Sequence, residues 1–118
     1  MNDNIKELIV EYNTSILSAI KKMDSLKCKL LIVTNKKKFY SLISIGDIQR
    51  AIIKNIPLDS EIKDIIRKEV KIASDSDPFE NIKQKMLQFR MEFMPVINAD
   101  KEIINLPEAF PGLALNKQ

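Results

Sequence analysis

The chain of 118 residues has no histidine, no tryptophan, one cysteine and two glycines. Without histidine, no serine–histidine or cysteine–histidine nucleophile can be assembled, and no imidazole can bind a metal ion. The single cysteine, Cys28, cannot form a zinc cage or an internal disulfide. Gly46 and Gly112 are too few for a dinucleotide-binding fingerprint or a P-loop. We therefore expect a protein that is not an enzyme, with no metal site and no required cofactor.

Long apolar runs are also missing, because no stretch approaches the roughly 20 residues that cross a bilayer. Residues 1–4 carry no basic region followed by an apolar stretch, so we expect no signal peptide. A lone cysteine fits a reducing environment. These observations predict a cytoplasmic protein without a membrane partner.

Charge of one sign is not concentrated in any large block. The net charge is +3, from 19 lysine and arginine residues against 16 aspartate and glutamate residues. The one dense basic run, 36–38, is typical of a solvated hairpin tip, although a phosphate contact is the open alternative. Asp75 and Asp77 are typical of a helix start rather than a metal site. A nucleic-acid binder usually shows a concentrated basic stripe, so we do not expect a nucleic-acid partner.

The composition is that of an ordinary folded domain, with 45% hydrophobic and 30% charged residues. Helical and strand patterns alternate along the first half. The polar cluster at 13–15, which ends in Ser15, can cap the helix that follows it, and Ser44 can cap the helix that starts at residue 45. The expected elements are a short helix or strand within 5–10, a helix at 16–26, strands at 30–33 and 39–44, and a helix at 45–55.

After Pro57 the same order of elements returns. Asp59 or Ser60 can cap a short linking helix that ends near residue 66. Asp77, Pro78 and Glu80 predict a helix start with a capping box. The other expected elements are strands at 70–73, 93–97 and 102–106, a turn at 98–101, and a largely irregular tail at 107–118.

The two halves match when the chain is shifted by about 63 positions. The apolar helix positions Ile16, Ala19 and Met23 then fall on Phe79, Ile82 and Met86. With one inserted residue, 30–33 falls on 94–97. Each match is weak alone, but the shared order and spacing predict an internal repeat. Two such units would each present an apolar sheet face, and pairing them about a pseudo-twofold axis would bury both.

The repeat resembles the CBS domain (cystathionine β-synthase domain). The resemblance is carried by residues 13–23, 31–33 and 42–51 in the first half, and by 79–86 and 94–97 in the second. Its most specific part is the segment Ser44-Ile45-Gly46-Asp47-Ile48. The resemblance implies an α/β (α+β) fold of two pseudo-symmetric β-α-β-β-α units packed sheet to sheet. The units would be 1–57 and 58–118, the second truncated or degenerate after about 106, together forming one module.

In this family, tandem domains form a disc, also called a Bateman module, and commonly regulate a linked enzyme or transporter. They commonly bind AMP, ADP, ATP or S-adenosylmethionine between the two sheets. The Gly46–Ala51 segment also resembles pairs attached to sugar-nucleotidyltransferases or sugar-phosphate isomerases. The resemblance therefore implies a regulatory ligand, a homodimer, and a partner enzyme acting on a sugar nucleotide or sugar phosphate.

Candidate ligand-binding residues follow from the family motif at the strand-to-helix corner. A helix N-terminus favours phosphate, and the Ser44 hydroxyl adds a donor there. Asp47 could accept hydrogen bonds from ribose hydroxyls, and Arg50 could offer a charged fork to phosphate. Adenine would lie against Ile45 and the N-terminal strand, with Leu8 as the candidate contact.

The same residues have a purely structural interpretation, which stays open. Ser44 is also an ordinary helix cap, and Asp47 is a favourable charge near a helix start. The positions in the second half that answer to Ser44 and Asp47 fall near 107–111 and lack the motif. The alternative function is therefore a dimerisation or docking module with a degenerate, empty nucleotide cleft.

Overall fold

The computed structural model describes residues 3–66, 70–91 and 93–107. The first half contains α1 (Asp3–Glu7), β1 (Ile9–Glu11), α2 (Ile16–Leu26), β2 (Leu30–Asn35), β3 (Lys38–Ser44) and α3 (Ile45–Ile53). A 3₁₀ turn, η1 (Ile62–Asp64), follows. The second half contains β4 (Ala73–Ser74), α4 (Phe79–Gln88), β5 (Val96–Ile97) and β6 (Ile103–Asn105).

The strands form two three-stranded sheets of the same design. In each, the first strand runs parallel to the second, and the second pairs antiparallel with the third. Ile9 lies opposite Ile32 in the first sheet, and Ala73 lies opposite Val96 in the second. The sequence comparison predicts that Val96 matches Ile32, since it places 30–33 on 94–97. Ala73 follows Ile9 by the same interval as Val96 follows Ile32, a match that the sequence comparison does not include. The repeat is therefore present in the strand register.

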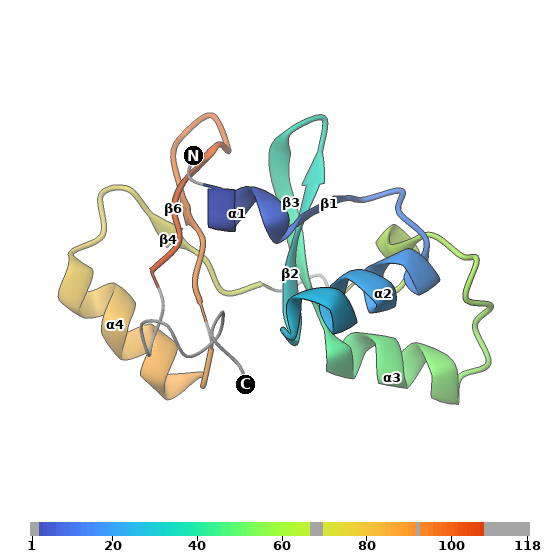
Figure 1. The fold of residues 1–118 in the computed structure, drawn as a ribbon. Helices are drawn as coiled ribbons and strands as arrows, with labels where there is room; N and C mark the ends of the chain where they lie inside the picture. The colour runs from blue at the N-terminus through green and yellow to red at the C-terminus, as the bar shows by residue number, and fades with distance from the viewer. Residues whose placement is uncertain (1–2, 67–69, 92, 108–118) are drawn as a thin grey trace.

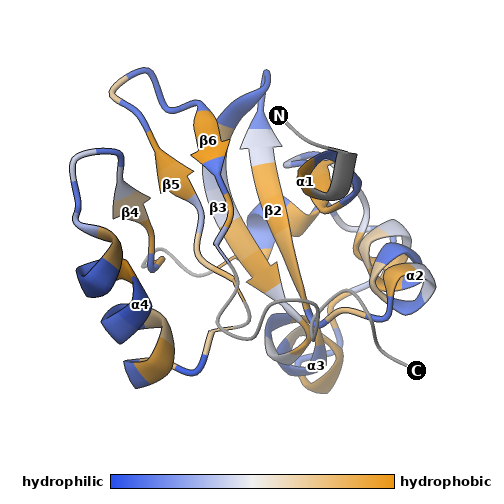
Figure 2. Cartoon of the chain, turned by 60° about the vertical axis from the view of Figure 1, so that its left-hand side comes forward, coloured by the Kyte–Doolittle hydropathy of each residue, from blue (hydrophilic) through white to orange (hydrophobic). Residues whose placement is uncertain are grey.

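The sheets lie next to each other between the helices. Figure 1 shows α4 on the outer side of the second sheet, and α2 and α3 on the opposite side of the molecule. Figure 2 shows the apolar colouring concentrated along the strands. The main buried cluster joins Leu31 and Ile43 of the first half with Phe93, Ile97 and Ile103 of the second. The predicted α/β architecture is confirmed, since one core spans both sheets.

The two sheets also meet through the backbone at their hairpin ends. The Phe39 N–H of β3 donates to the Lys101 carbonyl at 2.8 Å. Lys36 and Lys37 form the two-residue turn between β2 and β3, and both have positive φ, 53° and 69°. Such a turn matches the right-handed twist of the flanking strands. Side-chain packing and this hydrogen bond together hold the two sheets in one body.

The segment after α3 lies against the first half. The Leu17 and Ile16 N–H groups donate to the carbonyls of Leu58 and Ser60. The Ile62 N–H donates to the Thr14 carbonyl at 2.8 Å. This return path covers the beginning of α2, where Ile16 is fully buried. The repeat boundary at residue 57 stays a prediction.

Three predictions for the linking region and α4 are wrong in detail. Within 59–66 the helical structure is limited to the 3₁₀ turn η1, and its cap is Glu61 rather than Asp59 or Ser60. The helix α4 has Pro78 as its N-cap without a side-chain cap. The Asp77 carboxylate instead accepts from the Ser74 N–H, 2.9 Å away, and so closes the preceding turn.

The second sheet is also smaller than the pattern predicts. Its first strand is two residues long, because β4 begins at Ala73 instead of residue 70. Pro95 directly precedes β5, the central strand, and the Pro95 carbonyl accepts from the Ala73 N–H. Ile82 and Met86 are buried as predicted, but Phe79 is 63% exposed. Residues 108–118 of the tail, which is predicted to be largely irregular, lie outside the described residues.

Candidate functional site

The candidate site is the corner where β3 ends and α3 begins. Ser44 is the last residue of β3, lies opposite Leu30 of β2, and has extended backbone angles (φ −108°, ψ 163°). The helix starts at the next residue, so the Ser44 side chain stands over the first turn of α3. The Ile45 N–H donates to the Lys29 carbonyl at 2.9 Å, which ties the corner to the end of α2. The sheet and both helices therefore position this corner.

A capping box closes the first turn of α3. The Asp47 N–H donates to Ser44 Oγ at 3.2 Å, and the Ser44 N–H donates to Asp47 Oδ2 at 2.8 Å. Ser44 Oγ also donates to Asp47 Oδ2 at 3.0 Å. Each residue satisfies a backbone N–H that a helix start leaves without an intrahelical partner. The cap predicted at Ser44 is confirmed, and Asp47 completes it.

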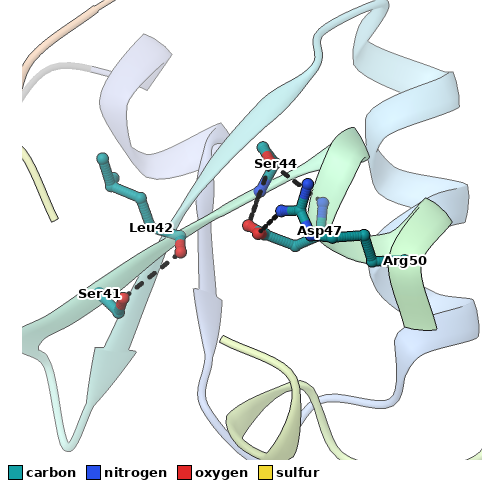
Figure 3. A network of polar contacts seen from close by, with 5 residues as sticks. All are labelled: Ser41, Leu42, Ser44, Asp47 and Arg50. Carbon is teal, nitrogen blue, oxygen red and sulfur yellow. Dashed lines mark hydrogen bonds and ion pairs between the residues drawn. The ribbon is translucent and has the colours of Figure 1, made fainter. Parts of the chain in front are cut away.

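Arg50 adds a second layer to the corner. Its guanidinium contacts Asp47 Oδ1, so Ser44 and Arg50 together engage both carboxylate oxygens. Figure 3 shows Ser44 and Arg50 both contacting the Asp47 carboxylate. The Asp47 side chain is 1% exposed, while that of Arg50 is 53% exposed. The ion pair therefore has one buried member, Asp47, and one member in contact with solvent, Arg50.

The Arg50 guanidinium lies next to Gly46, which has no side chain to displace it. A Cβ atom built on Gly46 would lie 3.5 Å from Arg50 Nη1 and 3.5 Å from Ser44 Oγ. These are ordinary van der Waals distances, so alanine would fit there without strain. Larger side chains would compete with Arg50 for the same space.

The other predicted contacts lie apart from this network. Leu8 is 1% exposed in the core, and its carbonyl accepts from the Ile32 N–H. Its role as an adenine contact stays a prediction. Ile45 is partly buried and faces the end of α2, where it lines a hollow with Ile20 and Met23. Ser41 is buried, and its hydroxyl lies 3.4 Å from the Leu42 carbonyl.

Two features of the site were not predicted from the sequence. The ion pair between Asp47 and Arg50 was missed, although their i, i+3 spacing on a helix is the signal that finds such pairs. The hollow beside Ile45 was also missed, because it depends on how α2 ends. Among the residues that the structure describes, no group of cysteine, aspartate and glutamate could hold a metal ion. None of the described helices is long and apolar enough to cross a membrane.

Comparison with known proteins places this geometry in a fold class. No protein-family model matches the sequence, and no curated protein matches it. Solved structures do match. CBSX2 from Arabidopsis thaliana superposes with a TM-score of 0.71 at 20% identity, over 88% of this chain and 82% of that one. A CBS domain protein from Pyrobaculum aerophilum in complex with AMP gives 0.69 at 20% identity, covering 86% and 79%.

A third structure is the CBS domain pair of protein MJ0100 in complex with 5-methylthioadenosine and S-adenosyl-L-methionine. It gives a TM-score of 0.69 at 20% identity, over 86% of this chain and 81% of that one. The protein thus belongs to the mixed α/β class with two sheets packed together. More particularly, its fold is that of a CBS domain pair.

Proposed function

We propose that this protein is a regulatory module that binds an adenine nucleotide at the corner formed by Ser44, Asp47 and Arg50. The observation that carries the proposal is the convergence of a hydroxyl, a buried carboxylate and a half-exposed guanidinium at the start of α3. Two proteins of the same fold hold AMP or adenosyl ligands. The regulated activity would belong to a linked or partner enzyme.

Binding would proceed as an exchange of partners at Asp47. The Arg50 guanidinium would turn from Asp47 Oδ1 toward the ligand phosphate, where a bidentate contact is favourable. The carboxylate would then accept hydrogen bonds from ribose hydroxyls. Because Arg50 is half exposed and its partner is buried, the arginine is the group that can move. After the exchange Arg50 would be paired with the phosphate, and the Asp47 carboxylate would keep its hydrogen bonds from Ser44 and gain those of the ribose hydroxyls, so it would stay hydrogen-bonded without a cation.

A thermal-shift series tests the proposal. AMP, ADP, ATP and S-adenosylmethionine are each added to the wild type, to Asp47→Asn and to Arg50→Gln. A ligand at a hundred times its dissociation constant adds about 2.7 kcal/mol to the free energy of unfolding. We expect a nucleotide to stabilise the wild type and to lose most of this effect in both variants.

Two substitutions of the same kinds away from the corner serve as controls. Asp59→Asn and Lys54→Gln change exposed residues, so they should keep the full stabilisation by nucleotide. The proposal fails if none of the four ligands stabilises the wild type. It also fails if the corner variants respond to nucleotide as the controls do.

A dimerisation or docking module with an empty cleft is the second candidate. Asp47 is already satisfied by Ser44 and Arg50, which is the arrangement expected of a purely structural cap. Large apolar side chains are also exposed around α2 and α3: Leu17, Ile52, Ile53 and Leu58. Apolar surface on helices favours association with another subunit. The predicted homodimer would use this surface.

Light scattering tests the second candidate. We expect the wild type to be a dimer at high micromolar concentration and Ile53→Lys, at a position 76% exposed, to be monomeric. Ile104→Lys is the matched control, because it places the same charge at an exposed isoleucine of β6. A monomeric wild type would remove this candidate. The partner enzyme acting on a sugar nucleotide or sugar phosphate rests on the resemblance of residues 46–51 alone.

A further inference from the structure

A hollow of about 540 Å³ lies where α2 ends and α3 begins. Its apolar walls are formed by Ile20 and Met23 of α2, Cys28 of the connecting turn and Ile45 of α3. Volumes of this size accommodate small organic molecules, and mostly apolar walls are typical of their sites. Asp47 and Arg50 are not among the lining residues, so the hollow shares only Ile45 with the residues proposed to contact a nucleotide.

Backbone hydrogen bonds fix the walls of the hollow. Helix α2 ends with Lys27 in the left-handed conformation, and the Lys27 N–H points back to the Asp24 and Met23 carbonyls. The Cys28 N–H donates to the Met23 carbonyl at 3.1 Å. On the other side, the Lys29 carbonyl accepts from the Ile45 N–H. The hollow is therefore set by the end of one helix and the start of the next, and a ligand need not order it.

The charged side chains of the hollow carry a positive excess. Lys27, Lys29 and Asp24 line it. Asp24 lies 3.9 Å from Lys27, but both side chains are more than 60% exposed, so their attraction is weak. Within the described part of the chain, no carboxylate forms an ion pair with Lys29. The turn thus holds two ammonium groups next to an apolar wall.

We propose that this hollow binds a small organic acid with an apolar body. The carboxylate would lie between the Lys27 and Lys29 ammonium groups, and the aliphatic or aromatic part would pack on Ile20, Met23 and Ile45. A neutral molecule of the same shape would bind more weakly, because it gains burial without the ionic contacts. The proposal does not require nucleotide binding at Asp47, since its ionic contacts come from Lys27 and Lys29.

An NMR titration of the ¹⁵N-labelled full chain with octanoate tests the proposal. We expect saturable amide shifts confined to residues 20–29 and 45, and at least fivefold weaker binding of octan-1-ol. Lys27→Met and Lys29→Met should each weaken octanoate binding about two- to fivefold, the range for one exposed ionic contact. Lys36→Met, which removes an exposed lysine from the hairpin turn, should leave binding unchanged.

Three results would overturn the proposal. The first is the absence of saturable shifts at the hollow up to millimolar octanoate. The second is equal binding of octanoate and octan-1-ol, which would indicate apolar partitioning only. The third is an equal effect of Lys29→Met and Lys36→Met, which would indicate attraction to net charge and not to this pair of lysines.

Discussion

At the scale of single residues, Asp47 links the stability of the protein to its proposed function. A carboxylate that is 1% exposed requires partners, and Ser44 and Arg50 supply them. The Arg50 contact is the one that a nucleotide would have to replace. The free energy of the Arg50–Asp47 contact therefore opposes ligand binding, and it lowers the affinity of this corner for a nucleotide.

Removing the Asp47 carboxylate should destabilise the fold without any ligand. Hydrogen bonds to a charged group are worth about 1.5–3 kcal/mol, so we expect Asp47→Ala to lower the free energy of unfolding by about 2 kcal/mol. Asp47→Asn keeps an acceptor for the Ser44 N–H and should cost about 1 kcal/mol. Urea unfolding measures both values. A loss below 0.3 kcal/mol for the alanine variant, roughly the error of such measurements, would contradict this account of the corner.

Glu11 gives the protein a predictable response to acid. The Thr34 hydroxyl, followed by the Lys36 and Lys37 N–H groups, holds the pKa of Glu11 below its ordinary value of 4.5, while burial acts in the opposite direction. The unfolded chain therefore binds a proton at Glu11 more readily than the folded one. The stability that Glu11 contributes is present above its unfolded pKa and is lost as the pH falls through the folded pKa.

Glu11→Gln should thus be less stable than the wild type at pH 7, and the difference should shrink below about pH 4.5. Urea unfolding between pH 7 and pH 3 measures this difference. Glu7→Gln, an exposed neighbour in α1, is the control. A difference between Glu11→Gln and the wild type that is constant across this range would contradict the assignment.

At the scale of helices and strands, the sequence predicts the first half well. The amphipathic period of α2, the cap at Ser15 and the two strands on either side of the basic turn are all local signals, and each is confirmed. The second half is predicted less well because its surroundings decide it. Phe79 has the spacing of a buried residue but is exposed. Residues 58–62 cover Ile16 in the first half, whereas no neighbouring element in the described chain covers Phe79 in the same way.

The site shows the same division between local and distant information. Ser44 capping α3 follows from residue type and spacing, so it could be predicted. The burial of Asp47 and the resting position of Arg50 over Gly46 depend on packing around the corner, which no local pattern encodes. The hollow at Ile45 likewise depends on how two helices meet.

The unequal burial of equivalent helix positions predicts unequal costs of truncation. Ile16 is 0% exposed and Phe79 is 63% exposed, although they occupy the same place in the repeat. We expect Ile16→Ala to cost about 2–5 kcal/mol, as for other buried isoleucines. Phe79→Ala should cost less than about 1 kcal/mol. Equal costs in urea unfolding would show that Phe79 is covered in solution, for example by a second subunit.

At the scale of the whole molecule, two sheets of one design share a core but do not share a site. Phe93, Ile97 and Ile103 join the first half's buried cluster, so the second half completes the core of the first. The second half has no Ser44–Asp47 motif at the equivalent repeat positions, which would fall near 107–111. Because only the first half has the polar side chains of the proposed nucleotide site, we expect one nucleotide to bind per chain.

The most direct test of this account is the calorimetric titration of AMP into the wild type and into Asp47→Asn, with circular dichroism to verify that both are folded. We predict saturable binding of one AMP per chain and loss of this heat in the variant. Two equal sites, the absence of binding, or unchanged binding in Asp47→Asn would contradict the claim that a ligand takes the place of Arg50 at the start of α3.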